Sequence, residues 1–335
     1  MPSLSSLQLG RAFRLIMQTL PIAAVRLGAN IAFWVVTLVY LGITGGLAYL
    51  VWQAIPAVGV ILFLVALGGL GPLYKLAQKY VLYVIKAAQI AVMAEILVND
   101  RLPAGASQLA WGKERVQERF GEVSAMFLVD ELVSGVVSAF TGVVYRVASF
   151  LPGDTFRSLA NILNRVIRFA VGYIDEAILA RTFWLQSGSV WANARDGVVL
   201  YGMVWKPLLA NAVALMLISY VPFVVVAILF SAPIGALTSL ISPNVAGWSI
   251  IATLVLAYLV KVAIGDAFAM AAMISAYQRE TQELEPDPAV TSKLEQISDK
   301  FRTLQQRALG EQAGAALGGE AGTTPALDTG ADASE

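Results

Sequence analysis

The sequence predicts an all-α integral membrane protein with two transmembrane helical hairpins (four spans), separated by long amphipathic helices that lie in the membrane interface or re-enter it. Hydrophobic residues make up 58% of the 335 residues and charged residues only 14%, whereas an ordinary soluble domain has about 25% charged residues. Two long stretches, 27–74 and 207–260, contain no charged residue. Each is long enough for two passes of about 20 residues with a turn between them.

Residues 1–28 are expected to form an amphipathic segment before the first hairpin. Arg11, Arg14 and Arg26 interrupt its apolar residues, so a cleaved signal peptide is not expected. The first hairpin is then expected over residues 29–74. Its two helices are predicted over 29–51 and 56–74, with the turn at the sequence WQAIP.

Residues 75–206 combine charged and apolar side chains and predict amphipathic helices on the cytoplasmic side. On the helix expected over 75–97, Lys75, Lys79 and Lys86 fall within about 40° of one line at 3.6 residues per turn. Lysines on an otherwise apolar helix typically extend to the headgroups of the bilayer. We therefore expect these three lysines to contact lipid headgroups, with anionic lipids among the partners.

A stripe of polar side chains runs along the helix expected to begin near residue 154. At 100° per residue its members lie within about 40° of one line, and Arg165 and Glu176 flank it. Two interpretations stay open: the stripe faces water and headgroups while the helix lies in the interface, or it lines a hydrated cavity between helices. The members of the stripe are Arg157, Asn161, Asn164, Arg168 and Asp175.

The second hairpin is expected over 207–281. Its first helix is predicted over 208–230, its turn within 231–247, and its last helix from Trp248 onward. That last helix is longer than one straight crossing requires, and it contains Lys261 and Asp266. Either Lys261 reaches the inner boundary of the bilayer, or the helix lies deeper and Asp266 becomes an ion or proton ligand inside the membrane.

The C-terminal part is expected to leave the membrane. Residues 287–308 predict a cytoplasmic amphipathic helix, and residues 309–335 have the composition of a disordered tail. The helix carries an apolar strip that needs a partner, either a second copy of the chain, a partner protein or the 75–206 block. The strip consists of Leu294, Ile297, Phe301, Leu304 and Ala308.

The charged residues fall in three blocks, before Leu27, from Lys75 to Lys206, and from Lys261 on. If both charge-free stretches form hairpins, the three blocks lie on one side of the membrane. The arginines and lysines that flank the hairpins predict that this side is the cytoplasm. Both termini are therefore expected in the cytoplasm, and the membrane is expected to be a plasma membrane or a bacterial inner membrane.

The sequence gives no sign of catalysis. It has no histidine and no cysteine, which excludes thiol chemistry, Cys/His metal sites and histidine-based triads. It also lacks phosphate-binding and catalytic motifs. We expect no enzymatic activity, no cofactor and no metal site, and the zero net charge gives no basis for a nucleic-acid partner.

Residues 157–285 resemble the C-terminal part of the choline transporter-like family. The resembling pieces are FAVGYIDEAILARTFWLQSGSVWANARDGVVLYGMVWK and AIGDAFAMAAMISAYQRETQELE. The resemblance implies a transporter-like architecture that moves a small polar or cationic solute. The alternative is a non-transporting protein whose hairpins and interfacial helices shape or scaffold the membrane. For transport, the candidate polar pathway consists of Arg165, Arg168, Asp175, Glu176, Lys261 and Asp266.

Overall fold

The computed structural model of the chain describes residues 9–77, 81–121, 123–149, 154–185, 188–241 and 247–320. It is all-helical, with 91% helix and no strand in the described part, which confirms the all-α prediction. By length and composition, four of the described helices suffice to cross a membrane. They cover Leu20–Ala54, Ala125–Val143, Val190–Leu240 and Trp248–Thr281. This set differs from the four predicted spans, because the helix at Pro56–Pro72 is shorter than the other four and Ala125–Val143 lies in the block predicted as interfacial or re-entrant.

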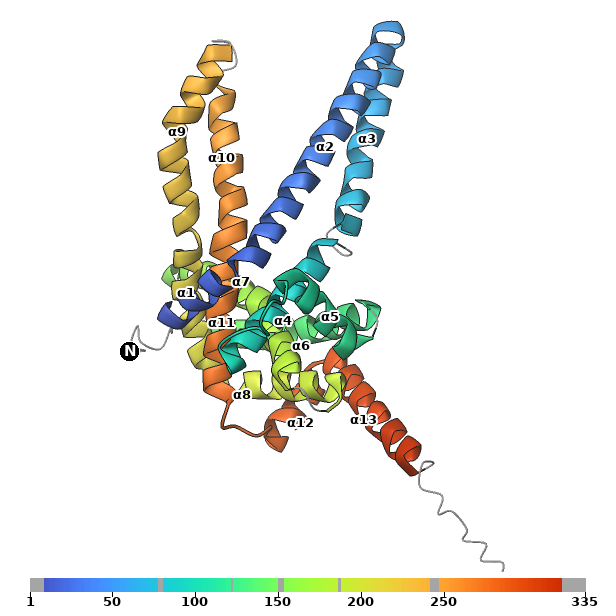
Figure 1. Cartoon of the computed structure of the whole chain (residues 1–335), viewed down its shortest axis with the longest axis vertical. Coiled ribbons are helices and arrows are strands. Elements are labelled where there is room, and N and C mark those ends of the chain that lie inside the picture. Colours follow the sequence, from blue (N-terminus) through green and yellow to red (C-terminus); the bar gives the residue numbers. More distant parts are fainter. Residues whose placement is uncertain are drawn as a thin grey trace, which may run out of the picture.

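Two pairs of apolar helices rise from a common helical base (Figure 1). In the first pair α2 (Leu20–Ala54) lies beside α3 (Pro56–Ala77), and in the second α9 (Val221–Ile241) lies beside α10 (Trp248–Val260). The pairs diverge with distance from the base. Their apolar side chains are exposed, with Leu38 at 65% and Ile228 at 69%. Apolar side chains exposed along two whole pairs of helices require lipid or another protein to cover them.

The first pair turns where the sequence predicts. Ile55 has extended backbone (φ −139°, ψ 91°) and ends α2, and Pro56 begins α3, a position where its missing N–H costs nothing. Gly59 allows the close approach after the turn, because a Cβ there would lie 2.5 Å from Cα of Trp52. α2 begins at Leu20 rather than near residue 29, so Arg26 is part of this helix.

The second pair differs from the prediction in its boundaries. Residues 208–219, expected in a span, belong to α8 (Val190–Ser219), and Leu208, Ala212 and Leu215 are buried. The projecting helix α9 runs instead to Ile241, through most of the segment predicted as a turn. Hydropathy does not distinguish burial against protein from exposure to lipid. Here residues 208–219 have protein neighbours, because α11 (Asp266–Thr281) packs along α8.

The base contains the remaining helices. These are α1 (Leu9–Gln18), α4 (Tyr83–Asn99), α5 (Gln108–Phe120), α6 (Val123–Ser149), α7 (Asp154–Trp184), the first part of α8, α12 (Pro288–Ile297) and α13 (Asp299–Glu320). Of these, α1, α4, α7 and α8 contact α11. The residues of α11 from Ala269 to Tyr277 are all buried, and the hydroxyl of Tyr277 donates to the Gly197 carbonyl on α8 (2.8 Å). The helices predicted as interfacial therefore share a protein core of their own.

A π-helical turn joins α10 to α11 and makes the long last helix that the sequence predicts. The turn covers Lys261–Gly265, and such turns insert one residue into a helix and are frequent at functional sites. A Cβ on Gly265 would lie 2.1 Å from the carbonyl oxygen of Ser219. Only glycine fits there, so the backbone of the π-helical turn touches the end of α8.

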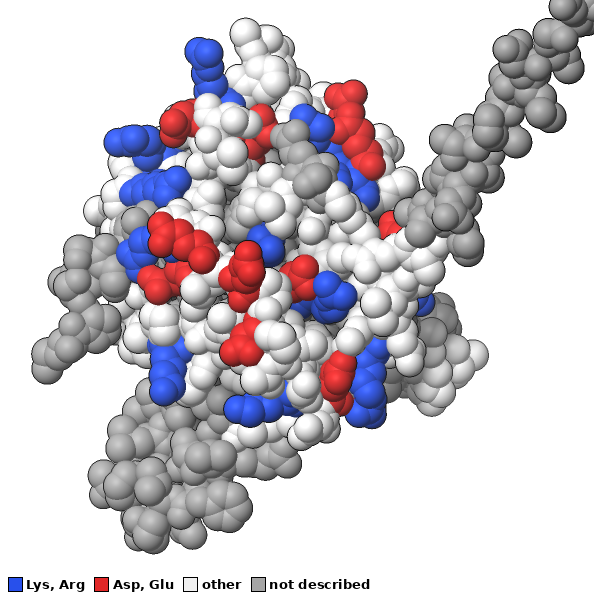
Figure 2. Space-filling view, turned by 90° about the horizontal axis from the view of Figure 1, so that it is seen from below, with Lys and Arg blue, Asp and Glu red and all other residues white. Residues whose placement is uncertain are grey.

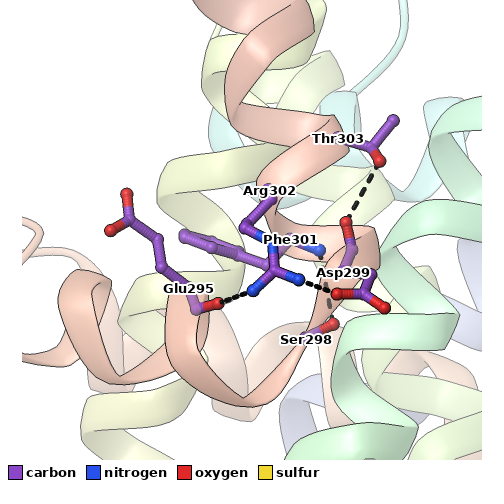
Figure 3. Close-up of polar contacts among 6 residues, drawn as sticks. All are labelled: Glu295, Ser298, Asp299, Phe301, Arg302 and Thr303. Carbon is purple, nitrogen blue, oxygen red and sulfur yellow. Dashed lines mark hydrogen bonds and ion pairs between the residues drawn. The ribbon is translucent and has the colours of Figure 1, made fainter.

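The C-terminal amphipathic segment is two helices rather than one. Ser298 interrupts it with extended backbone (φ −143°, ψ 114°) and accepts a hydrogen bond at Oγ from the Phe301 N–H (3.3 Å). Arg302 braces the corner by donating to the Glu295 carbonyl (2.8 Å) and pairing with Asp299 (Figure 3). α13 then continues to Glu320, so residues 309–320, predicted as disordered, are helical.

The apolar strip of that segment is covered by the chain itself. Leu294, Phe301, Leu304 and Ala308 are buried, and α12 and α13 pack against α6 and α8. Ile297 alone of the five predicted strip residues is exposed, at 38%. The 75–206 block, which is one of the partners expected for the strip, contacts it. The outer face of the base, opposite the pairs, shows side chains of both charge signs (Figure 2).

Candidate functional site

Charged side chains from five elements meet at the foot of the two pairs. The ammonium group of Lys86 on α4 forms an ion pair with Oε1 of Glu176 on α7. The Lys86 side chain is 26% exposed and that of Glu176 only 5%. Oε2 of Glu176 is buried and has no hydrogen-bond partner within the described part of the chain. A buried carboxylate of this kind depends strongly on its one cationic partner.

A second ion pair lies at the π-helical turn. Nζ of Lys261 is 2.6 Å from Oδ1 of Asp266 and 5.0 Å from the centre of the Tyr220 ring. The same carboxylate oxygen accepts a hydrogen bond from the hydroxyl of Tyr173 (2.9 Å). Tyr173 lies on α7, three residues before Glu176, and so it connects the two ion pairs.

Arg26 joins this group from the base of α2. Its guanidinium donates to Oε1 of Gln89 on α4 (3.2 Å), and its carbonyl accepts from the side chain of Asn30 (2.7 Å). Gln89 is fully buried, and its Nε2 has no hydrogen-bond partner among the described residues.

We call the residues assembled here the foot cluster. Some of them line a cavity of about 200 Å³ that lies between α2, the start of α4 and the π-helical turn. The cavity is lined by Arg26, Asn30, Leu82, Tyr83, Lys86 and Val262. The volume is ample for water, which needs about 10–15 Å³ of such space. The cluster consists of Arg26, Asn30, Tyr83, Lys86, Gln89, Tyr173, Asp175, Glu176, Lys261 and Asp266.

Burial changes the protonation of the cluster. Burial raises the pKa of Asp175 to about 8, and the charges of Asp130 and Glu176 act in the same direction while Lys86 opposes them. Burial by itself would lower the pKa of Lys86, but Glu176 and Asp175 outweigh it and leave the pKa raised. Near neutral pH, Lys86 is therefore cationic and Asp175 is mostly protonated.

Four of the six predicted pathway residues lie in the foot cluster: Asp175, Glu176, Lys261 and Asp266. The structure does not bring Arg165 and Arg168 into it, because both side chains are exposed earlier on α7. Of the predicted stripe, Arg168 is exposed and Asp175 belongs to the foot cluster. Its members Arg157, Asn161 and Asn164 have side chains outside the described part.

The three lysines expected to contact headgroups do not share one surface. Lys75 is exposed near the end of α3, and Lys79 lies outside the described residues. Lys86 instead forms the ion pair with Glu176. Among the described residues, α3 ends at Ala77 and α4 begins at Tyr83.

Several cluster residues could not be found from the sequence. Tyr173 is assigned by periodicity to the apolar face of its helix, yet its hydroxyl reaches Asp266, which is 93 residues away. Gln89 and Asn30 carry no charge and stand in apolar surroundings in the sequence. Arg26 offered one usable signal, because it is the last charged residue before a charge-free stretch.

No protein-family model, curated protein or solved structure significantly matches the chain. The resemblance to the choline transporter-like family therefore rests on the two sequence pieces alone, neither supported nor contradicted by these comparisons.

Proposed function

We propose that the chain is a multi-pass membrane protein that shapes or scaffolds the bilayer, with the two pairs crossing it as hairpins and the base and both termini on the cytoplasmic side. The charge-free, lipid-suited surface of two separate pairs favours this function over transport, the other function that the sequence leaves open. The pairs diverge (Figure 1), their apolar side chains are exposed, and neither pair contains a charged residue between Leu27 and Tyr74 or between Pro207 and Val260.

This arrangement argues against a transport pathway within one chain. A polar solute that crosses a bilayer needs polar groups along its path. The charged side chains stop at Arg26 and Lys261, at the foot of the pairs. Beyond that level, the pairs offer surface suited to lipid. Two separated apolar anchors on one packed base instead displace lipid at two points, which is a means of imposing shape or order on a membrane.

Membrane topology can be tested by labelling, because the chain has no cysteine. Ile55 lies at the turn of the first pair and Glu283 follows α11 at the base, and both side chains are exposed. In intact cells, a membrane-impermeant maleimide should label Ile55→Cys directly and label Glu283→Cys only after permeabilisation. Equal labelling of both variants in intact cells contradicts the proposed topology.

Membrane shaping can be tested in proteoliposomes of one lipid composition. We expect the mean vesicle diameter, measured by electron cryomicroscopy, to change progressively as the protein-to-lipid ratio increases. The control is an unrelated four-span protein at the same ratios, which corrects for the volume of inserted helices. A diameter that follows the control at every ratio would exclude the shaping function.

Transport of a small polar or cationic solute is the second candidate, and a specific observation favours it. The foot cluster unites Asp175, Glu176, Lys261 and Asp266 beside a polar cavity, as a binding site for a charged solute would require. The test is uptake of choline into proteoliposomes by the wild type, Asp266→Asn and Arg168→Gln. Transport through the cluster requires uptake by the wild type that Asp266→Asn abolishes and Arg168→Gln, an exposed control, leaves unchanged.

A further inference from the structure

The cavity of the foot cluster is lined by residues from three segments of the chain. Arg26 and Asn30 contribute from α2, Tyr83 and Lys86 from α4, and Val262 from the π-helical turn below α10. It therefore lies at the point where the two pairs separate. Beyond Arg26, α2 continues with exposed apolar side chains, of which Ile31 is 43% exposed. A molecule with a polar end and an apolar end would match both surroundings.

The charges in the cavity wall favour an anion. Among the described residues, no carboxylate lies within 4.0 Å of the Arg26 guanidinium, whose hydrogen bond in the structure goes to the neutral Gln89. A guanidinium has five N–H donors and remains cationic. Lys86 is paired with Glu176, but an ammonium group has three donors and can serve a second acceptor. Asn30 and Tyr83 complete the polar wall, where the Asn30 amide donates to the Arg26 carbonyl and the Tyr83 hydroxyl lies close to the Asp130 carboxylate.

Buried polar atoms beside the cavity supply independent evidence that the site is incomplete in the chain alone. Nε2 of Gln89 and Oε2 of Glu176 are both buried and have no hydrogen-bond partner in the described part. Buried polar atoms almost always have partners in protein or ordered water. An acceptor in the adjacent cavity would serve the donor Nε2 of Gln89, whereas Oε2 of Glu176 is itself an acceptor and requires a donor such as water.

We infer that this cavity binds the phosphate of an anionic phospholipid, with Arg26 as the principal contact and the acyl chains lying along the exposed apolar surfaces of the pairs. The placement at headgroup depth rests on the proposed crossing of the pairs. Basic pockets between membrane helices on the cytoplasmic side are a recurrent form of headgroup site. Arginine suits the role because its planar donors match two phosphate oxygens.

The test is lipid binding to the full chain in a neutral detergent, measured by native mass spectrometry. The probes are phosphatidylglycerol, phosphatidylcholine with the same acyl chains, and inorganic phosphate. Phosphatidylglycerol should bind more tightly than phosphatidylcholine, and inorganic phosphate should bind weakly. Arg26→Gln should weaken phosphatidylglycerol binding about tenfold, equivalent to about 1.4 kcal/mol, and Arg26→Lys should retain part of the affinity.

The matched control is Arg14→Gln, which removes the same charge from an exposed position on α1 outside the cavity. Gln at position 26 can still donate to Gln89, and an unchanged melting temperature would show that the fold is intact. Equal losses in Arg26→Gln and Arg14→Gln, or equal affinity for the two lipids, would overturn the inference. Inorganic phosphate binding as tightly as the lipid would show a free-anion site instead. Because binding is measured in micelles, these results are independent of the labelling of Ile55→Cys.

Discussion

Replacing Lys86 by Gln removes the one cation that pairs with a buried carboxylate. The Glu176 side chain is 5% exposed and its second oxygen has no partner in the described part. Without Lys86 it must stay charged in a poorly solvated site or take up a proton, and breaking a buried ion pair in this way costs about 3–5 kcal/mol. Glu176→Gln should cost less, about 1–2 kcal/mol, because Lys86 is 26% exposed and can reach water.

The double variant Lys86→Gln/Glu176→Gln separates the interaction from the two individual changes. It leaves two neutral amides that can hydrogen bond, so it should be more stable than Lys86→Gln alone, with a coupling of about 1–3 kcal/mol. The assay is equilibrium unfolding of the full chain in mixed detergent micelles at pH 7, followed by tryptophan fluorescence. The reasoning is refuted if the two single variants cost the same and the double variant equals their sum within about 0.5 kcal/mol.

Three further changes test other parts of the fold. Burial raises the pKa of Asp175 to about 8 in the folded chain. Between about pH 4 and pH 8 the folded chain therefore holds a proton that the unfolded chain has lost, and the free energy of unfolding decreases as pH rises through this range. Asp175→Asn should raise the melting temperature at pH 8 and have little effect at pH 4. Gly265→Ala should cost about 1–3 kcal/mol or more, because its Cβ would lie 2.1 Å from the Ser219 carbonyl oxygen, whereas Gly235→Ala in open space should not destabilise the chain. Phe301→Ala should cost about 3–5 kcal/mol, since this ring is fully buried, and limited proteolysis should then release α13.

The foot cluster gives a physical reason for the π-helical turn. The turn brings Lys261 and Asp266 into contact across five residues, a spacing that an α-helix does not place on one line. The same turn places Asp266 within reach of Tyr173 on α7. The hydrogen bond therefore connects the base of the second pair to the helix that carries Glu176. Asp266→Asn should remove the ion pair with Lys261 and keep an oxygen that accepts the hydrogen bond from Tyr173.

The sequence by itself determined the helical class and the location of the first pair. Composition and two charge-free stretches indicate apolar helices because charges are too costly in a bilayer. The turn at Ile55 follows from a local rule, since Pro56 favours the first position of a helix. The apolar repeat of Leu294, Phe301 and Leu304 likewise indicated a buried face, although it could not indicate the break at Ser298.

The tertiary structure decided which apolar residues are covered by protein and which charges meet. Residues 208–219 and 221–241 are similarly apolar, but only the first have α11 beside them. Lys86 and Glu176 are 90 positions apart, and no periodicity links two helices so distant in the chain. Hydrophobic and helical patterns are properties of neighbouring residues, whereas the foot cluster depends on contacts between helices far apart in sequence.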